Sequence, residues 1–201
     1  MVKTLLVPGL DGSNSPHWQQ WWAATDNHAL MVDLSDPSRP DPTRWESELA
    51  SAILRHPGAV LVGHSLGAVL ITRVLTAWPQ LNVRAALLVA PAEAQGQPRI
   101  QSFAPLNEAA LHVPTTVVAS RNDPWMPFQR AINLAKLWQA GLIDLGFAGH
   151  INVASGFGPW PAGKQLRADL LLQSAPNLIV RHTGAAISAP REQTSTDLLQ
   201  V

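Results

Sequence analysis

The chain reads Ala59-Val60-Leu61-Val62-Gly63-His64-Ser65-Leu66-Gly67, an apolar run that ends in the pattern Gly-x-Ser-x-Gly. Apolar residues then recur at helical intervals of three and four, at Leu66, Val69, Leu70, Val74 and Leu75. A strand, a sharp turn and a helix in this order predict a nucleophile elbow, in which the turn lifts the hydroxyl of Ser65 above the sheet. Glycine is needed two residues to either side because a side chain there would collide with the neighbouring strand or helix.

Short apolar runs alternate with helical patterns along the rest of the chain, which is typical of α/β proteins with a parallel sheet. Strands are expected at residues 4–8, 29–34, 59–63, 84–90, 115–120 and 142–145. Helices are expected from Ser15 and Pro16 through Trp22, from a capping box at Thr43, at about 128–138 and at about 163–173. We therefore predict about six mainly parallel strands in a three-layer α/β/α sandwich.

The composition excludes several classes of protein. Lys plus Arg and Asp plus Glu both number 14, so no net charge would attract nucleic acid or an anionic membrane surface. The absence of cysteine excludes disulfides and thiolate chemistry and is compatible with the cytoplasm, where we expect the protein. No apolar run approaches the length of a membrane span. No two histidines stand at metal-ligand spacing on an expected helix, so no metal site is expected.

The chain length of 201 residues fits one domain with a full core. We assign residues 1–175 to this domain and residues 176–201 to a C-terminal extension of unknown role, which is polar and adds no catalytic group. Residues 90–114 follow the fourth expected strand, where open α/β sheets place ligand-binding loops. They are the only insertion large enough to build a cap, and they are short, so we expect little or no cap domain.

A serine hydroxyl becomes a strong nucleophile only beside a base that is itself oriented by an acid. In this architecture the chain order is serine, then acid, then histidine. Asp123 lies just past the strand expected at 115–120 and is our predicted acid, with Glu93 as the second choice. Asp144 lies inside an expected strand, where an edge or pairing role is predicted instead.

The predicted base is His150, which follows a glycine in the loop after the last expected strand. The only later histidine is His182, beyond the last expected helix. Earlier histidines are interpreted as structural or surface groups: His17, His28, His56 and His112.

An oxyanion hole needs two backbone N–H groups aimed at the developing charge. The residue after the nucleophile, Leu66, is expected to supply one of them. The second is assigned to Leu10 in the glycine-containing loop 8–13, with Asp11 as the alternative donor. The Asp11 carboxylate is expected to stabilise this turn or the following helix N-terminus rather than to act in catalysis.

Four side chains are expected to border the nucleophile and form the substrate pocket: His64, Phe103, Trp125 and Trp160. His64 precedes the nucleophile and is predicted to point into the pocket wall. The chain has eight tryptophans and no tyrosine, which favours a site lined with indole rings.

Several motifs together are more specific than the elbow alone. They are Val7-Pro8-Gly9 with His17-Trp18, the elbow itself, Leu88-Val89-Ala90-Pro91-Ala92, Asn122-Asp123-Pro124-Trp125-Met126-Pro127, and Gly149-His150-Ile151-Asn152 leading to Ser155-Gly156-Phe157-Gly158-Pro159-Trp160-Pro161. With these motifs the chain resembles the small serine hydrolases of the retinoblastoma-binding-protein-nine-like family, a compact branch of the α/β-hydrolases. The resemblance covers roughly residues 2–172.

This resemblance implies a compact α/β-hydrolase domain over residues 1–175, a triad of Ser65, Asp123 and His150, and no cofactor. The expected function is cleavage of small carboxylic esters through an acyl-enzyme, with a small-molecule ester as the partner. Whether a protein partner exists is left open by the sequence. Two alternatives keep the same fold, namely a non-catalytic binding module, and an amide hydrolase or acyltransferase that uses the same triad.

Overall fold

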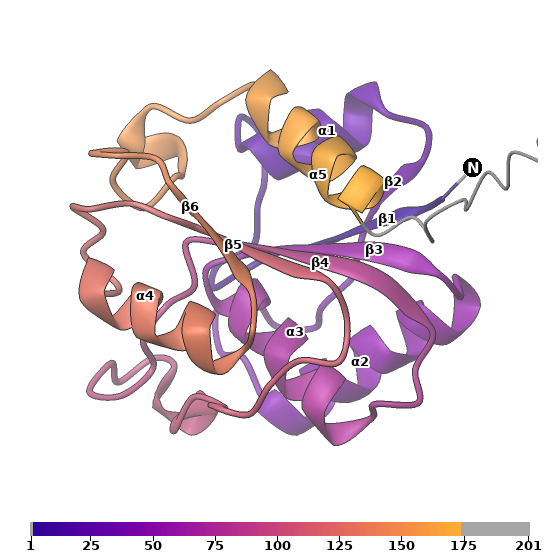
Figure 1. Cartoon of the computed structure of the whole chain (residues 1–201), viewed down its shortest axis with the longest axis horizontal. Helices are drawn as coiled ribbons and strands as arrows, with labels where there is room; N and C mark the ends of the chain where they lie inside the picture. Colours follow the sequence, from indigo (N-terminus) through magenta and orange to yellow (C-terminus); the bar gives the residue numbers. More distant parts are fainter. Residues whose placement is uncertain (1, 174–201) are drawn as a thin grey trace, which may run out of the picture.

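In the computed structural model, which describes residues 2–173, a parallel sheet lies between two layers of helices (Figure 1). Among these residues six strands run in the order β2-β1-β3-β4-β5-β6, and every neighbouring pair is parallel. They are β1 (Thr4–Val7), β2 (Ala29–Met31), β3 (Ala59–His64), β4 (Val83–Val89), β5 (Thr115–Ala119) and β6 (Gly141–Asp144). The expected extension at 176–201, with His182 in it, lies outside the described residues.

Five helices are described over the same residues, together with two short 3-10 helices. They are α1 (Trp18–Thr25), α2 (Pro42–Arg55), α3 (Leu66–Ala77), η1 (Gln101–Phe103), α4 (Phe128–Leu137), η2 (Val153–Ser155) and α5 (Pro161–Gln173). Helices α1 and α5 cover one face of the sheet, and α2, α3 and α4 cover the other (Figure 1). Two apolar cores result, one on each face, because strands covered on both sides bury both sets of side chains. The predicted three-layer sandwich is therefore confirmed.

The second strand is shorter than the apolar pattern at 29–34 predicts. It ends at Met31, although the N–H of Val32 still donates to the carbonyl oxygen of Leu6 at 2.8 Å. Val32 and Leu34 are buried. The apolar pattern thus indicates buried residues and not the length of the strand. It continues for three residues beyond the last residue of β2.

Two helices start at residues other than those expected. The predicted N-cap of α1 at Ser15 is wrong, because the cap is His17, whose Nδ1 accepts the N–H of Gln19 at 3.1 Å. The predicted capping box at Thr43 is also wrong. Asp41 caps α2 instead, since its carboxylate accepts the backbone N–H three residues further on, at 2.8 Å. An imidazole and a carboxylate thus take the role that the hydroxyls were expected to play.

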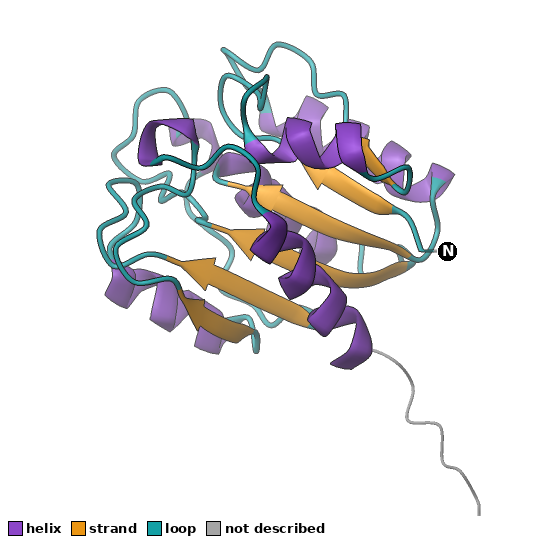
Figure 2. Ribbon diagram, turned by 90° about the horizontal axis from the view of Figure 1, so that it is seen from above, coloured by secondary structure: helices purple, strands orange, loops and turns teal. Residues whose placement is uncertain are grey.

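The carboxyl ends of all six strands point to one side of the sheet, where the connecting loops gather (Figure 2). The strand order reverses between β1 and β3, since β2 lies on one side of β1 while the later strands continue on the other. Ligands of open α/β sheets bind beside such a switch point. The loops after β1 and β3 carry Leu10 and Ser65, so both residues are brought to this place.

Residues 90–114 build no separate cap over the sheet. Their large side chains turn inward and are buried in the core beneath α2 and α3: Ile100, Phe103, Leu106 and Leu111. The edge of the Phe103 ring meets Trp45 of α2 with ring centroids 5.8 Å apart. Within residues 2–173, this insertion therefore does not cover the site at the strand ends. Among the described helices none is both long enough and apolar enough to span a bilayer.

Candidate active site

Ser65 lies in the turn between β3 and α3 with φ 56° and ψ −121°, a backbone conformation that residues other than glycine rarely adopt. The glycines around it are required by close contacts. A methyl group on Gly63 would lie 2.7 Å from the backbone of Ala68, and one on Gly67 would overlap the carbonyl group of Val7. The turn is thus held between β1 and α3 in the elbow geometry that the sequence predicts.

Ser65, His150 and Asp123 form one chain of hydrogen bonds. Oγ of Ser65 lies 2.8 Å from Nε2 of His150, and Nδ1 of His150 lies 2.9 and 3.0 Å from the two carboxylate oxygens of Asp123. A carboxylate accepts only, so Nδ1 carries the proton and Nε2 is free to accept from the serine hydroxyl. The imidazole and the carboxylate are 6% and 3% exposed, so water competes little for these bonds.

The loop after β5 holds the acid in place. The N–H of Trp125 donates to Oδ1 of Asp123 at 2.8 Å, and the indole ring of Trp125 lies 5.7 Å from the His150 ring. The backbone N–H therefore helps to keep the carboxylate oriented toward the imidazole.

Partners from separate elements hold the loop that carries His150. Its N–H donates to Oγ of Ser155 at 3.0 Å, and its carbonyl oxygen accepts from Nε2 of His64 at 2.9 Å. On either side, the N–H of Gly149 donates to Oδ1 of Asn122, and the indole N–H of Trp18 donates to the next carbonyl oxygen. These bonds fix the backbone on both sides of the imidazole, which orients the ring.

The loop after β1 passes directly against the elbow. A methyl group on Gly9 would lie 3.0 Å from Cβ of Ser65 and 3.2 Å from the nitrogen of Leu66. Among the described residues, the N–H groups of Leu10 and Leu66 have no hydrogen-bond acceptor. The alternative donor, the N–H of Asp11, is already used, because it donates to a carbonyl oxygen in the loop before α2 at 2.7 Å. Leu10 and Leu66 thus each keep a free N–H group near Ser65.

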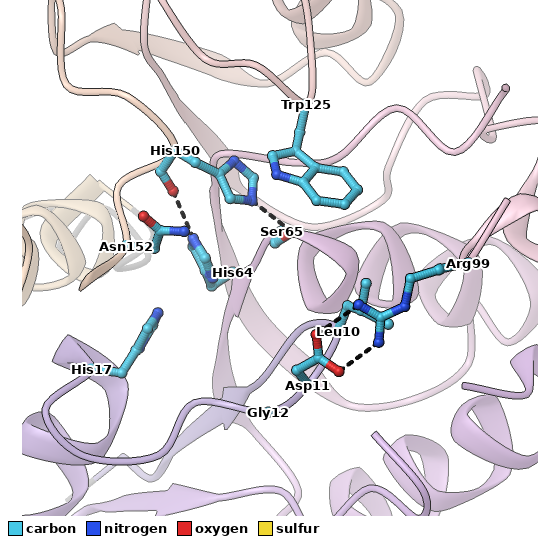
Figure 3. A pocket seen from close by; sticks show the side chains of 10 residues that line it. All are labelled: Leu10, Asp11, Gly12, His17, His64, Ser65, Arg99, Trp125, His150 and Asn152. Carbon is cyan, nitrogen blue, oxygen red and sulfur yellow. Dashed lines mark hydrogen bonds and ion pairs between the residues drawn. The ribbon is translucent and has the colours of Figure 1, made fainter. Parts of the chain in front are cut away.

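A pocket of about 190 Å³ opens beside the Ser65 hydroxyl (Figure 3). Ten residues line it: Leu10, Asp11, Gly12, His17, His64, Ser65, Arg99, Trp125, His150 and Asn152. Two of the predicted pocket residues, His64 and Trp125, are among them. The lining is mostly polar, and the only large apolar surfaces come from Leu10 and Trp125.

The other two predicted pocket residues lie elsewhere. Phe103 is fully buried in the core against Trp45, because η1 turns its side chain away from the site. Trp160 packs at the start of α5 against Trp18 and Phe157, with ring centroids 5.3 and 5.7 Å apart. The prediction that Phe103 and Trp160 line the pocket is therefore wrong.

Most of the indole rings serve the fold and not the pocket. Four of the eight tryptophans are fully buried: Trp18, Trp22, Trp45 and Trp138. Their N–H groups reach acceptors in neighbouring loops or turns at 2.7 to 3.3 Å. An indole combines a large apolar body with one donor, so it can fill the core and tie a loop to it. Only one tryptophan, Trp125, lines the pocket described above.

Burial keeps two histidines beside the site neutral. Burial, and to a lesser degree the nearby His150, lowers the pKa of His17 to about 4. Burial also lowers the pKa of His64 well below its usual range, and both neighbouring histidines act in the same direction. The three rings lie in a row, with centroids 4.9 Å apart between His17 and His64 and 5.0 Å between His64 and His150.

The other candidate acids are engaged in ion pairs. Glu93 binds Arg130 at 3.0 Å, and Asp144, at the end of the edge strand β6, binds Arg121 at 2.7 Å. Neither appears in the hydrogen-bonded chain that contains Ser65. The expected edge role of Asp144 agrees with this position.

Asp11 also has a partner that the sequence does not indicate. Its carboxylate forms two bonds with the guanidinium of Arg99, at 2.6 and 2.9 Å (Figure 3). Arg99 further donates to the carbonyl oxygen of Ser38 at 3.2 Å. This pair joins the loops that follow β1, β2 and β4 at the mouth of the pocket.

Sequence reasoning missed the supporting residues. The buried amide of Gln19 donates to the carbonyl oxygens of Val7 and Val62, both at 3.1 Å, and accepts from Ser13 at 2.6 Å. It thereby ties α1 to the ends of β1 and β3 and to the loop that carries Leu10. One signal was available, since an uncharged polar residue lies between tryptophans on the apolar face of a helix.

The described residues contain no group of three or more His, Asp or Glu side chains placed to hold a metal ion. The polar groups that the structure brings together at the site are the serine hydroxyl, the imidazole, the carboxylate and the free backbone N–H groups.

The model of the family described as Serine hydrolase matches residues 4–169, which is most of the chain. The chain belongs to the serine hydrolase family. It is 25% identical over 171 residues to the YdeN hydrolase of Bacillus subtilis (strain 168), covering 78% of this chain and 89% of that protein.

Solved structures agree with this assignment. A YdeN-like hydrolase from Pectobacterium atrosepticum superposes with a TM-score of 0.78 at 33% identity, over 88% of this chain and 94% of that one. A hydrolase of the α/β superfamily from Xanthomonas campestris pv. campestris has a TM-score of 0.66 at 22% identity, over 87% and 100% of the two chains, and shows the shared fold. The family and these relatives indicate a hydrolase with the compact α/β-hydrolase fold.

Proposed function

We propose that this serine hydrolase cleaves small carboxylic esters through an acyl-enzyme formed on Ser65. The observation that carries the proposal is the chain of hydrogen bonds from Ser65 through His150 to Asp123, built on a strained elbow turn. A buried carboxylate that only accepts holds the imidazole in the tautomer that can take a proton from the serine.

In the proposed reaction Oγ of Ser65 attacks the ester carbonyl carbon while Nε2 of His150 takes the hydroxyl proton. The carbonyl oxygen becomes an oxyanion and accepts hydrogen bonds from the N–H groups of Leu10 and Leu66. The intermediate then collapses, and the proton on His150 passes to the departing alcohol. Water enters, gives a proton to His150 and attacks the acyl carbon, which releases the acid and returns the proton to Ser65.

We also propose a narrower family placement, a reaction without a cofactor and a cellular location. The motifs at 122–127 and 149–161 favour the retinoblastoma-binding-protein-nine-like branch, which shares the compact fold. The expected cofactor-free reaction needs only the chain and a small-molecule ester. A cytoplasmic location remains a prediction from the absence of cysteine.

A fluorophosphonate probe tests the proposal directly, because it reacts only with an activated serine. We expect covalent labelling of the intact protein at Ser65, located by peptide mass spectrometry, together with hydrolysis of phenyl butyrate. A matched probe reaction with the Ser65→Ala variant should give no label. Absence of labelling in the folded wild-type protein would favour a non-catalytic binding module.

A further inference from the structure

His17 both caps helix α1 and lines the pocket. Its Nδ1 caps helix α1 by accepting the N–H of Gln19, so in the neutral ring the proton lies on Nε2. The residue is only 6% exposed, yet it lines the pocket beside Ser65. Figure 3 shows the outer end of its ring directed toward the side of the pocket where His64 and Asn152 lie.

The Nε2–H of His17 has no hydrogen-bond partner among the described residues. A buried donor without an acceptor destabilises the fold, and such groups in folded proteins are normally satisfied by ordered water or a ligand. The nearest ring, that of His64, uses its own Nε2 to hold the carbonyl oxygen of His150. The protein therefore keeps one buried donor unpaired in a residue that lines the pocket.

The charges of the surrounding groups indicate which kind of acceptor this donor can bind. Burial lowers the pKa of His17 to about 4, so the ring donates as a neutral group at neutral pH. Its titratable neighbours are His64, also held neutral by burial, and His150. Across the pocket the Asp11 carboxylate is neutralised by Arg99. A neutral donor in a charge-balanced pocket suits a hydroxyl or carbonyl oxygen better than an ionised group.

We propose that the substrate carries a hydroxyl or carbonyl oxygen besides its ester group, and that this oxygen accepts a hydrogen bond from Nε2–H of His17. This inference rests on the proposed ester hydrolysis and adds to it a specificity residue and a class of substrate, namely small oxygenated esters. The extra oxygen can belong to the acyl part or to the alcohol part of the ester.

Two pairs of esters show whether the extra oxygen belongs to the acyl part or to the alcohol part. Within each pair, one ester carries a hydroxyl group where the other carries a methyl group. The acyl pair is phenyl β-hydroxybutyrate and phenyl isovalerate. The alcohol pair is the monobutyrate of ethylene glycol and propyl butyrate. In one pair we expect wild-type kcat/KM for the hydroxyl ester to exceed that for the methyl ester by about tenfold, the size of one buried hydrogen bond.

Two variants of His17 separate the donor from the helix cap. His17→Asn places an amide oxygen where Nδ1 accepts, so it keeps the cap while removing the Nε2 donor. His17→Gln places an amide N–H near the position of Nε2. We expect the hydroxyl-to-methyl ratio to fall close to one in His17→Asn and to stay well above one in His17→Gln. The ratio, unlike the absolute rate, does not change when a variant is merely less well folded.

Three outcomes would overturn the inference. A wild-type ratio near one in both pairs would mean that no substrate oxygen reaches His17. An unchanged ratio in His17→Asn would mean that the donor binds only water. Failure of the wild-type protein both to cleave any of the esters and to react with fluorophosphonate would overturn the proposed function itself, and the inference with it.

Discussion

At the scale of single residues, the proposed role of Ser65 as nucleophile depends on two conditions that are met together. The backbone at φ 56° directs the hydroxyl away from the sheet, and the imidazole of His150 lies 2.8 Å away to accept its proton. Ser65→Ala removes one oxygen that is not needed for the core, so the fold should be retained. Hydrolysis of phenyl butyrate should fall by about 10⁴–10⁶ in kcat. Retention of more than about a tenth of wild-type turnover would exclude Ser65 as nucleophile.

The choice of acid can be tested by comparing two carboxylates. Asp123→Asn keeps the shape of the side chain but can hold the imidazole in the wrong tautomer, so kcat should fall by roughly 10⁴. Glu93→Gln is the matched control, because Glu93 is engaged with Arg130 and lies outside the hydrogen-bonded chain. Its kcat should stay close to the wild-type value. The reverse order of the two variants would move the acid to Glu93.

The neutral histidines also affect stability below neutral pH. Above pH 6.5 His17 is neutral in both the folded and the unfolded chain. As the pH falls, the unfolded chain binds a proton first, because burial lowers the folded-state pKa to about 4. Stability is therefore lost between these two values, by roughly 3 kcal/mol from this residue.

Urea unfolding at pH 7 and at about pH 4.5 measures this loss. The His17→Asn variant has no titrating group at the position, so its free energy of unfolding should fall less than that of the wild-type protein. His64, whose pKa burial also lowers, contributes with the same sign in both proteins. Equal losses in the two proteins would show that His17 is not held neutral by the fold.

At the scale of elements, the site depends on how closely β1 and α3 approach each other. Gly67 permits this approach, since a methyl group there would overlap the carbonyl groups of Val7 and Pro8. Gly67→Ala should force the elbow away from β1 and destabilise the protein by about 1–3 kcal/mol or more. Gly141→Ala on the edge strand β6 is the control, because its nearest neighbour would be Oγ1 of Thr116 at 3.5 Å. Urea unfolding should separate the two, and equal stabilities would contradict the tight packing of the elbow.

At the scale of the whole molecule, the packing of residues 90–114 into the core decides how much substrate the described part of the chain can cover. Residues 90–114 pack into the core, and the pocket measures about 190 Å³ with a mostly polar lining. Each buried methylene could contribute about 0.8 kcal/mol, but only where an apolar groove receives it. We therefore expect acetyl to butyryl esters to be cleaved faster than decanoyl or longer esters. A series of phenyl esters checks this, and kcat/KM that keeps rising beyond octanoyl would reveal an extended groove.

Local patterns in the sequence were sufficient for the architecture and for the proposed triad. Apolar runs predict the buried strands because a strand covered on both faces needs continuous apolar side chains. The elbow is recognisable because strand, turn and helix are consecutive in the chain. Asp123 and His150 could be proposed because each lies in the loop that follows a strand, and parallel strands end at one edge of the sheet.

The composition of the pocket was decided only by the tertiary structure. Phe103 turns into the core, while Arg99 reaches Asp11 across 88 residues of sequence, and neither outcome follows from a local pattern. The same is true of His17, whose one nitrogen caps a helix while the other is left without a partner. A local sequence pattern predicts a turn or a strand. Which side chains face one cavity depends instead on how loops from distant parts of the chain pack together.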